Sequence, residues 1–79
     1  MLNNIIRPFI QIKESPAGLI NNVNSLFSTT QNFKNNSLSV FLNGLELEEN
    51  EDYNIVSVNM FLLTTPPLIN DKIIVKYFI

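Results

Sequence analysis

The residues with the clearest chemical potential are five carboxylates in one short stretch of the chain. They are Glu46, Glu48, Glu49, Glu51 and Asp52. Paired carboxylates can serve as general acid and base, and carboxylate oxygens are ligands for hard cations such as Ca²⁺. A calcium loop, however, needs alternating ligands, a glycine at its sixth position and a distal glutamate. This stretch lacks that spacing, so we interpret it as a solvated acidic loop, with calcium binding as the alternative.

Other catalytic groups are scarce. The chain contains neither His nor Cys, so it lacks the usual general base near neutral pH, the commonest metal ligand, thiolate ligands and disulfides. A serine nucleophile would need a lysine base, but no Ser-x-x-Lys spacing occurs. Gly18 and Gly44 are too few to build a phosphate-binding loop. We therefore predict a protein that is not an enzyme and has no catalytic residue, metal or cofactor.

Size and composition favour a small domain that associates with other chains. At 79 residues and 9.0 kDa, there is room for one domain, and so small a domain buries only about 60% of its unfolded surface. Hydrophobic residues make up 46% and charged residues 15%, against about 25% charged in typical domains. With no disulfide available, oligomerisation remains as a source of stability. Either AT-rich coding explains this composition, or other subunits cover part of the apolar surface.

Charge and hydropathy exclude two classes of partner. The five basic residues are dispersed and the net charge is −2, which does not suit phosphate neutralisation on a nucleic acid. No apolar run is long enough for a transmembrane helix, and the first residues, Met1 to Asn4, lack the basic start of a signal peptide. We expect no nucleic-acid partner, no membrane partner, and synthesis in the cytoplasm.

The pattern of short apolar runs and turn residues predicts an all-β fold, a small antiparallel β-sandwich or partly open barrel of six to seven short strands. In segment 19–33 the apolar residues fall at helical spacing, but its many Asn and Ser residues are poor helix formers. We interpret this segment as a loop that leads into a strand. The expected strands are 5–13, 26–30, 38–42, 45–48, 53–56, 60–64 and 72–78.

Turn residues support this division into strands. Asn43-Gly44 is the strongest two-residue hairpin signal, because both residues tolerate positive φ. Pro66-Pro67 indicates a stiff corner. We expect a single β-domain over residues 1–79, in which residues 1–12 form either an N-terminal arm or an edge strand, since Pro8 lacks the donor that a central strand needs.

Alternation assigns residues to the two faces of the strands. The expected core positions are Leu38, Val40 and Leu42, then Ile73, Val75 and Tyr77, then Met60 and Leu62. The opposite faces are also apolar, and they carry Phe41, Phe61, Leu63, Ile74 and Phe78. Either a second layer covers these side chains within the domain, or they form a subunit interface.

The N-terminal arm is the other candidate interface. It carries Leu2, Ile5, Ile6, Phe9 and Ile10. We predict that these residues contact a neighbouring chain by adding a strand to it. The alternative is an ordinary first strand of the same domain.

Residues 38–77 resemble a recurrent module of tailed-phage structural proteins, found in tail-fibre attachment, neck and head-decoration proteins. The module has a strand ending in Asn-Gly, an Asp-Tyr pair that opens a strand, a hairpin, a Pro-Pro corner and an alternating last strand. The matching segments here are 40–45, 51–55, 65–67 and 71–77. The module usually has Gly where this chain has Asn50 and Asn70, and Asn is the next best residue at positive φ.

This resemblance implies a structural component of the virion: a minor capsid or decoration, neck, tail or fibre-anchoring subunit. Its partners would be other virion proteins, and it would be a homo-oligomer or present in several copies. One alternative is a receptor- or glycan-binding module that uses Tyr53 with Asn54 and Asp52. A small phage-encoded inhibitor of a host protein is another.

Overall fold

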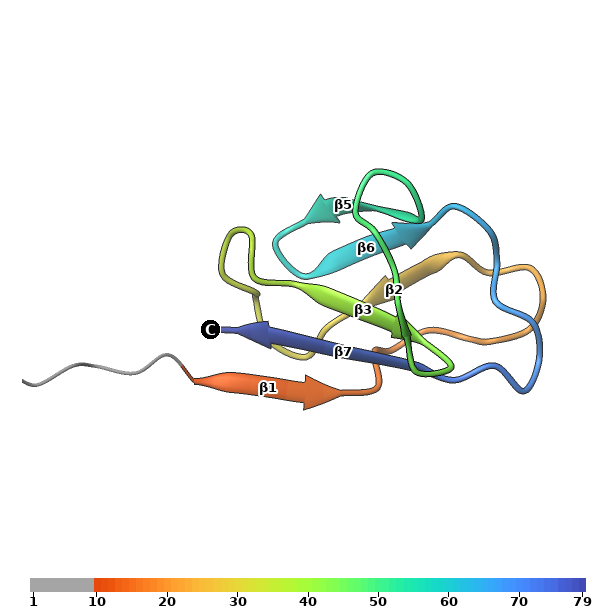
Figure 1. The fold of residues 1–79 in the computed structure, drawn as a ribbon, viewed down its shortest axis with the longest axis horizontal. Coiled ribbons are helices and arrows are strands. Elements are labelled where there is room, and N and C mark those ends of the chain that lie inside the picture. The colour runs from red at the N-terminus through yellow and green to blue at the C-terminus, as the bar shows by residue number, and fades with distance from the viewer. Residues whose placement is uncertain (1–9) are drawn as a thin grey trace, which may run out of the picture.

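A computed structural model describes residues 10–79, which form seven antiparallel strands in two sheets. The strands are β1 (Gln11–Glu14), β2 (Leu26–Ser28), β3 (Ser39–Leu42), β4 (Leu45–Glu46), β5 (Tyr53–Ser57), β6 (Met60–Leu63) and β7 (Ile73–Phe78). The strand order is β1-β7-β3-β4 in sheet A and β2-β6-β5 in sheet B. Figure 1 shows the two sheets as two layers. The predicted all-β class is confirmed, and the arrangement is a small β-sandwich.

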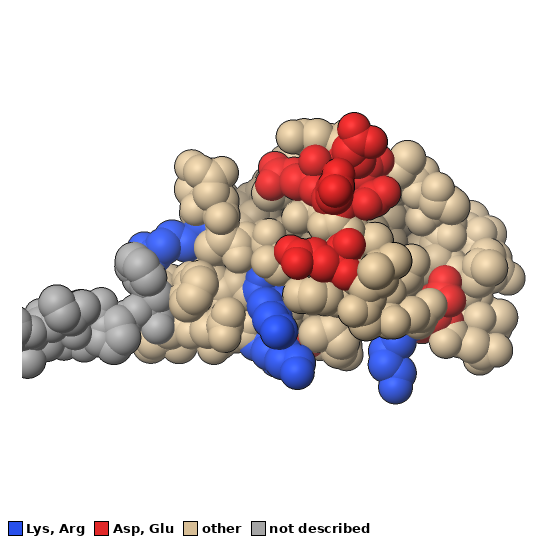
Figure 2. Space-filling model, in the orientation of Figure 1, with Lys and Arg blue, Asp and Glu red and all other residues tan. Residues whose placement is uncertain are grey.

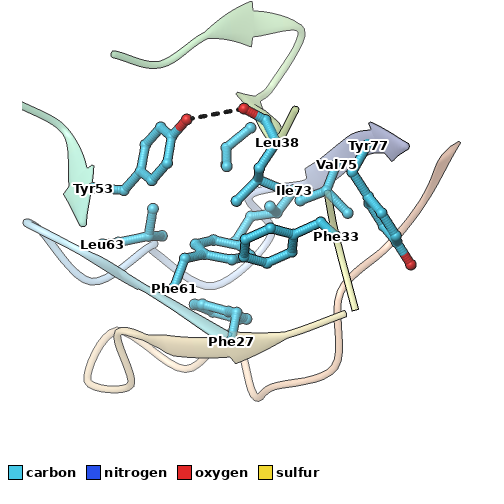
Figure 3. Close-up of a cluster of buried hydrophobic side chains, with 10 residues drawn as sticks. Phe27, Phe33, Leu38, Tyr53, Phe61, Leu63, Ile73, Val75 and Tyr77 are labelled. Atoms are coloured by element: carbon cyan, nitrogen blue, oxygen red, sulfur yellow. Dashed lines mark hydrogen bonds between the residues drawn. The ribbon is translucent and has the colours of Figure 1, made fainter. Parts of the chain in front are cut away.

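Ten buried side chains fill the space between the sheets. Phe61 lies at the centre, with its ring centroid 6.0 Å from those of both Phe27 and Tyr53 (Figure 3). Phe33 meets Tyr77 edge to face at 6.1 Å. The remaining members are Leu38, Val40, Leu63, Ile73 and Val75. The core faces predicted for β7 and for residues 38 and 40 are therefore confirmed, and Leu42 packs against the core while half-buried.

The faces predicted for β6 are wrong. Phe61 and Leu63, expected on the face opposite the core, are 0% and 4% exposed in the core, whereas Leu62 is 42% exposed on the outside and Met60 is half-buried. All four residues of this strand are apolar, so alternation alone does not decide which pair points inward. The register with β2 decides it, because it pairs Phe27 with Phe61 on the inner side.

The predicted turns depend on residues with positive φ. Asn43 and Gly44 have φ of 53° and 86°, as expected for a two-residue hairpin turn. Asn50 and Asn70, which stand where the module usually has Gly, have φ of 74° and 80°. Asn tolerates this region better than other non-glycine residues, so both turns form without glycine, as predicted.

Two of these turns are tied together at one end of the sandwich. The Asn43 side chain accepts a hydrogen bond from Lys72 N–H at 2.9 Å and donates one to Asp71 at 3.0 Å. The second carboxylate oxygen of Asp71 accepts from Leu68 N–H at 2.8 Å. The hairpin between β3 and β4 is thus fixed to the corner before β7. These bonds lower the pKa of Asp71, the bond from Asn43 contributing most.

We predict opposite outcomes for two adjacent substitutions in β6. Phe61→Ala should reduce the free energy of unfolding by about 3–5 kcal/mol, because it opens a cavity at the centre of the core. Leu62→Ala should reduce it by less than about 1 kcal/mol, because Leu62 faces outward. Urea unfolding followed by circular dichroism measures both, and a larger effect at Leu62 would contradict the observed register.

Candidate interaction surface

The acidic loop, residues 48–52, is closed by its own hydrogen bonds. Asp52 accepts from Glu48 N–H at 2.8 Å, and Glu48 C=O accepts from Asp52 N–H at 2.7 Å. Figure 2 shows acidic side chains gathered on one side of the molecule and basic ones mostly on the other. In the part of the chain that the structure describes, no three His, Cys, Asp or Glu side chains form a group that could hold a metal ion. The loop therefore forms a negatively charged surface next to the start of β5.

Tyr53, which follows the acidic loop, is a core residue. Its ring is 2% exposed, and its hydroxyl donates a weak hydrogen bond to Leu38 C=O at 3.4 Å. Burial raises the pKa of Tyr53, and the negative charges of Glu49 and Glu46 raise it further. The hydroxyl therefore stays protonated near neutral pH, and the ring has no exposed face on which a sugar could stack.

Glu14 joins the two sheets. Its carboxylate accepts hydrogen bonds from Thr30 N–H at 2.9 Å, Thr30 O–H at 2.7 Å and Tyr77 O–H at 2.7 Å. The Tyr77 oxygen accepts in turn from Gln31 N–H at 3.2 Å. Burial raises the pKa of Glu14, but the hydrogen bonds together outweigh it and hold that pKa below its ordinary value. No local sequence pattern indicates this network, because its partners lie 16 and 63 residues from Glu14.

The outer face of sheet A holds three of the predicted interface residues. Phe41 and Ile74 are directly paired on it, Phe78 lies further along β7, and all three are half-buried. The ammonium of Lys76 lies 5.1 Å from the centre of the Phe41 ring, which is a cation–π contact. Lys13 and Lys76 lie beside Phe41 and Ile74 on this face, and a lysine stem can cover apolar surface while its charge stays in water. This face is therefore less apolar than the sequence alone suggested.

The remaining predicted interface residues divide into two groups. Ile10 is 60% exposed, and its C=O accepts a hydrogen bond from Ile79 N–H at 3.1 Å. Ile10 thus extends the pairing of β1 with β7 by one residue. The other arm residues, Leu2, Ile5, Ile6 and Phe9, lie outside the described residues.

Three of the four sheet edges are protected against further strand pairing. The edge of β1 carries Lys13, whose neighbour across the ladder is Lys76, so a second β1 would meet like charges. The edge of β4 is only two residues long. The edge of β2 is covered by Ala17, which exchanges two hydrogen bonds with Ser28 at 2.8 and 3.0 Å.

Gly18 makes the close approach at the β2 edge possible. Its φ is +145°, and a Cβ atom there would lie 2.4 Å from the Phe27 ring. No other residue type fits between the covering segment and this ring without displacing one of them. The glycine therefore contributes directly to closing this edge.

Among residues 10–79, no segment pairs with the fourth edge, along β5, from Ile55 onward, and we call this stretch the open edge. Thr64 N–H donates to Asp52 C=O at 2.8 Å, which makes residues 52 and 64 a hydrogen-bonded pair of the β5–β6 ladder. Such pairs alternate with non-bonded ones in antiparallel sheets, so the N–H and C=O of Ile55 point away from β6. β5 carries no charged side chain. The start of β5 is protected against further strand pairing, because Tyr53 C=O already accepts a hydrogen bond from Asn50 N–H at 2.6 Å.

A groove of about 420 Å³ runs beside this open edge. Its lining is mostly apolar and comes from Phe33, Asn35, Ile55, Ser57 and Val58. Val58 is 60% exposed. Its C=O accepts a hydrogen bond from Phe33 N–H at 2.9 Å, which fixes the Phe33 side of the groove. The open edge and the groove together offer backbone hydrogen-bonding groups next to apolar surface, as sites of strand addition do.

A second exposed apolar area lies at the opposite end of the sandwich, where the loops before β2 and β7 meet. Leu19, Val23, Leu68 and Ile69 are each more than 60% exposed there; we call them the apolar end. Asn22 joins the two loops: its N–H donates to Pro67 C=O at 3.1 Å and its side chain accepts from Ile69 N–H at 2.7 Å. These side chains are therefore presented on a fixed backbone, which reduces the ordering entropy lost on binding.

No family model, no curated protein and no solved structure matches this chain. None of the described residues belongs to a helix that is long and apolar enough to cross a membrane.

We predict that the Glu14 network makes the protein sensitive to acid. The pKa of Glu14 is lower in the folded than in the unfolded state. Its contribution to stability is therefore complete above the unfolded pKa and is lost as pH falls through the folded pKa. Glu14→Gln should reduce the free energy of unfolding at pH 7 by about 1 kcal/mol and flatten its pH dependence in the acid range.

Urea unfolding between pH 3 and 7 measures this effect, with Glu51→Gln as a control of equal charge change. An unaltered pH dependence in Glu14→Gln would show that the network contributes no linked stability.

Proposed function

We propose that this protein is a structural subunit of a tailed-phage particle that acts through protein–protein contacts. Within the particle, a minor capsid or decoration, neck, tail or fibre-anchoring position fits the proposal. The observation that carries it is the open β5 edge with its apolar groove, on a domain whose other edges are protected. A free-standing protein normally blunts its edges, whereas a subunit of an assembly can leave one for a partner.

The rigidity of the module supports the same proposal. Side chains of Asn43, Asp71 and Asn22 hold the loops at the apolar end through bonds to backbone or to one another. The chain has no cysteine, so this order is reached without disulfides. A domain with fixed loops and two exposed apolar areas suits a part that is buried by several neighbours in a particle.

The glycan-binding alternative loses its expected site. It needed an exposed aromatic ring at Tyr53 beside polar side chains, and that ring is 2% exposed. The half-buried Phe41 ring carries the Lys76 ammonium over it. No feature of the described residues favours the inhibitor alternative over an assembly role.

The direct test is the amount of this chain in phage particles. Particles of the phage that encodes it, purified on a density gradient, should contain the chain at a fixed copy number per particle, measured by quantitative mass spectrometry. A copy number that matches a symmetry of the head, neck or tail would support the proposal. A chain that stays in the soluble lysate and is absent from the particles would contradict it.

A further inference from the structure

We infer that the open β5 edge and its groove receive residues 1–9 of a second copy of this chain. The inference rests on the proposed function, because it names the partner of the same surface. Ile10 pairs with Ile79 at the end of β7, Lys34 N–H donates to Phe78 C=O, and Phe33 N–H donates to Val58 C=O. The chain therefore enters β1 at the end of the sandwich where the groove lies.

The distance to its own groove favours a second copy. β1 and β5 lie on opposite sides of the sandwich, since β1 is an edge of sheet A near β2 and β5 is the far edge of sheet B (Figure 1). The two shorter extents of the molecule are 21 and 20 Å. Crossing that width takes about six residues at about 3.3 Å each, which leaves three to run along β5. A neighbouring copy can accept the whole segment.

The chemistry of residues 1–9 matches the site. Ile5 and Phe9, which share one face of an extended strand, supply apolar side chains for a groove of about 420 Å³ lined by Phe33, Ile55 and Val58. The segment has one charged side chain, Arg7, and the acidic loop stands directly before β5. Charge complementarity thus favours binding along this edge over binding at β1, where Lys13 and Lys76 lie together.

Proline at position 8 sets the register. It has no N–H to donate, so its nitrogen must face away from β5. Backbone groups alternate between the two sides of a strand. Ile5, Arg7 and Phe9 are therefore the residues whose N–H and C=O face β5, and Ile6 faces away. Ile5 is the partner of Ile55 in this pairing, because Phe9 adjoins Ile10, which pairs with Ile79 in its own domain, and Arg7 would place a charge against the apolar lining of the groove.

Each copy then donates one segment and accepts another. An arrangement of this kind closes either as a reciprocal pair or as a ring about a rotation axis. A ring of small subunits joined by exchanged strands fits a part of a symmetric particle.

Proline substitutions test both partners of this contact in the full-length chain. Ile5→Pro and Ile55→Pro each remove a donor that the intermolecular pairing uses. Ile55→Pro spares the β5–β6 ladder, because its N–H faces outward. Ile6→Pro is the matched control, since its nitrogen faces away from β5. Val58→Lys places a charge in the groove and leaves the backbone unchanged.

Sedimentation should give an oligomer for the wild type and for Ile6→Pro. For the other three variants it should give a mass near the 9.0 kDa monomer, with association weakened about tenfold or more. Thermal melts of the monomeric fractions check that each variant is folded. An Ile5→Pro oligomer as stable as that of the wild type would overturn the inference and leave the assembly role standing. A wild-type monomer at every concentration would also overturn it, and the particle copy number would still decide the proposed function.

Engineered cysteines identify the contact directly, because the chain has no native cysteine. A mixture of one chain with Ile5→Cys and another with Ile55→Cys should form a disulfide-linked heterodimer, because the two residues lie opposite each other in the proposed pairing. Leu45→Cys is the control for exposure, since Leu45 is 71% exposed at the other end of the sandwich. If the double variant Ile5→Cys/Ile55→Cys forms its bond within one chain, the segment docks on its own domain, and the proposal of a second copy is wrong.

Discussion

A sandwich of two short sheets has four edges. In this molecule, protecting three of them against further strand pairing determines the course of the loops and which edge stays available to a partner. The edge of β2 is covered by Ala17 because Gly18 allows the chain to lie against Phe27. The edge of β1 is held in place by Glu14 and protected by lysine. The segment from β4 to the acidic loop leaves sheet A and shields the start of β5. What remains open is a short, uncharged stretch beside a groove.

Side-chain hydrogen bonds to the backbone carry much of the order in the loops. Among the described residues, asparagine supplies more of them than any other residue type, at Asn21, Asn22, Asn24 and Asn43. Asparagine both tolerates positive φ and offers a donor and an acceptor to nearby backbone groups, so a single residue type forms the turns and fixes them. This matters in a domain whose core is ten side chains, because so small a core leaves little stability in reserve.

Local signals predicted the fold class and most strand positions. The Asn-Gly hairpin, the corner at Pro66-Pro67 and the alternation along β7 each depend on residues close in sequence. The faces of β6 could not be predicted, because Met60 to Leu63 are all apolar and the decision comes from pairing with β2. The link between Glu14 and Tyr77 spans 63 residues, and no local pattern indicates it.

The candidate interaction surface was predicted only in part. Apolar residues on a second strand face suggested Phe41, Ile74 and Phe78, but lysine stems and their half-buried positions make that face less open than expected. The open edge at Ile55 depends on which pairs of the β5–β6 ladder are hydrogen-bonded and on the irregular register between Ile55 and Ser57. Both follow from three-dimensional pairing, which is why sequence patterns do not reveal them.

The most direct test of this account is amide hydrogen exchange at Ile55 in the full-length chain, measured by NMR across a dilution series. The account predicts fast exchange at low concentration, where the edge is open, and protection that rises with concentration together with the sedimenting mass. Neighbouring Asn54, whose N–H belongs to the β5–β6 ladder, should stay protected throughout. Slow exchange of Ile55 in the monomer, or fast exchange in the assembled state, would contradict the claim that this edge is where copies of the chain join.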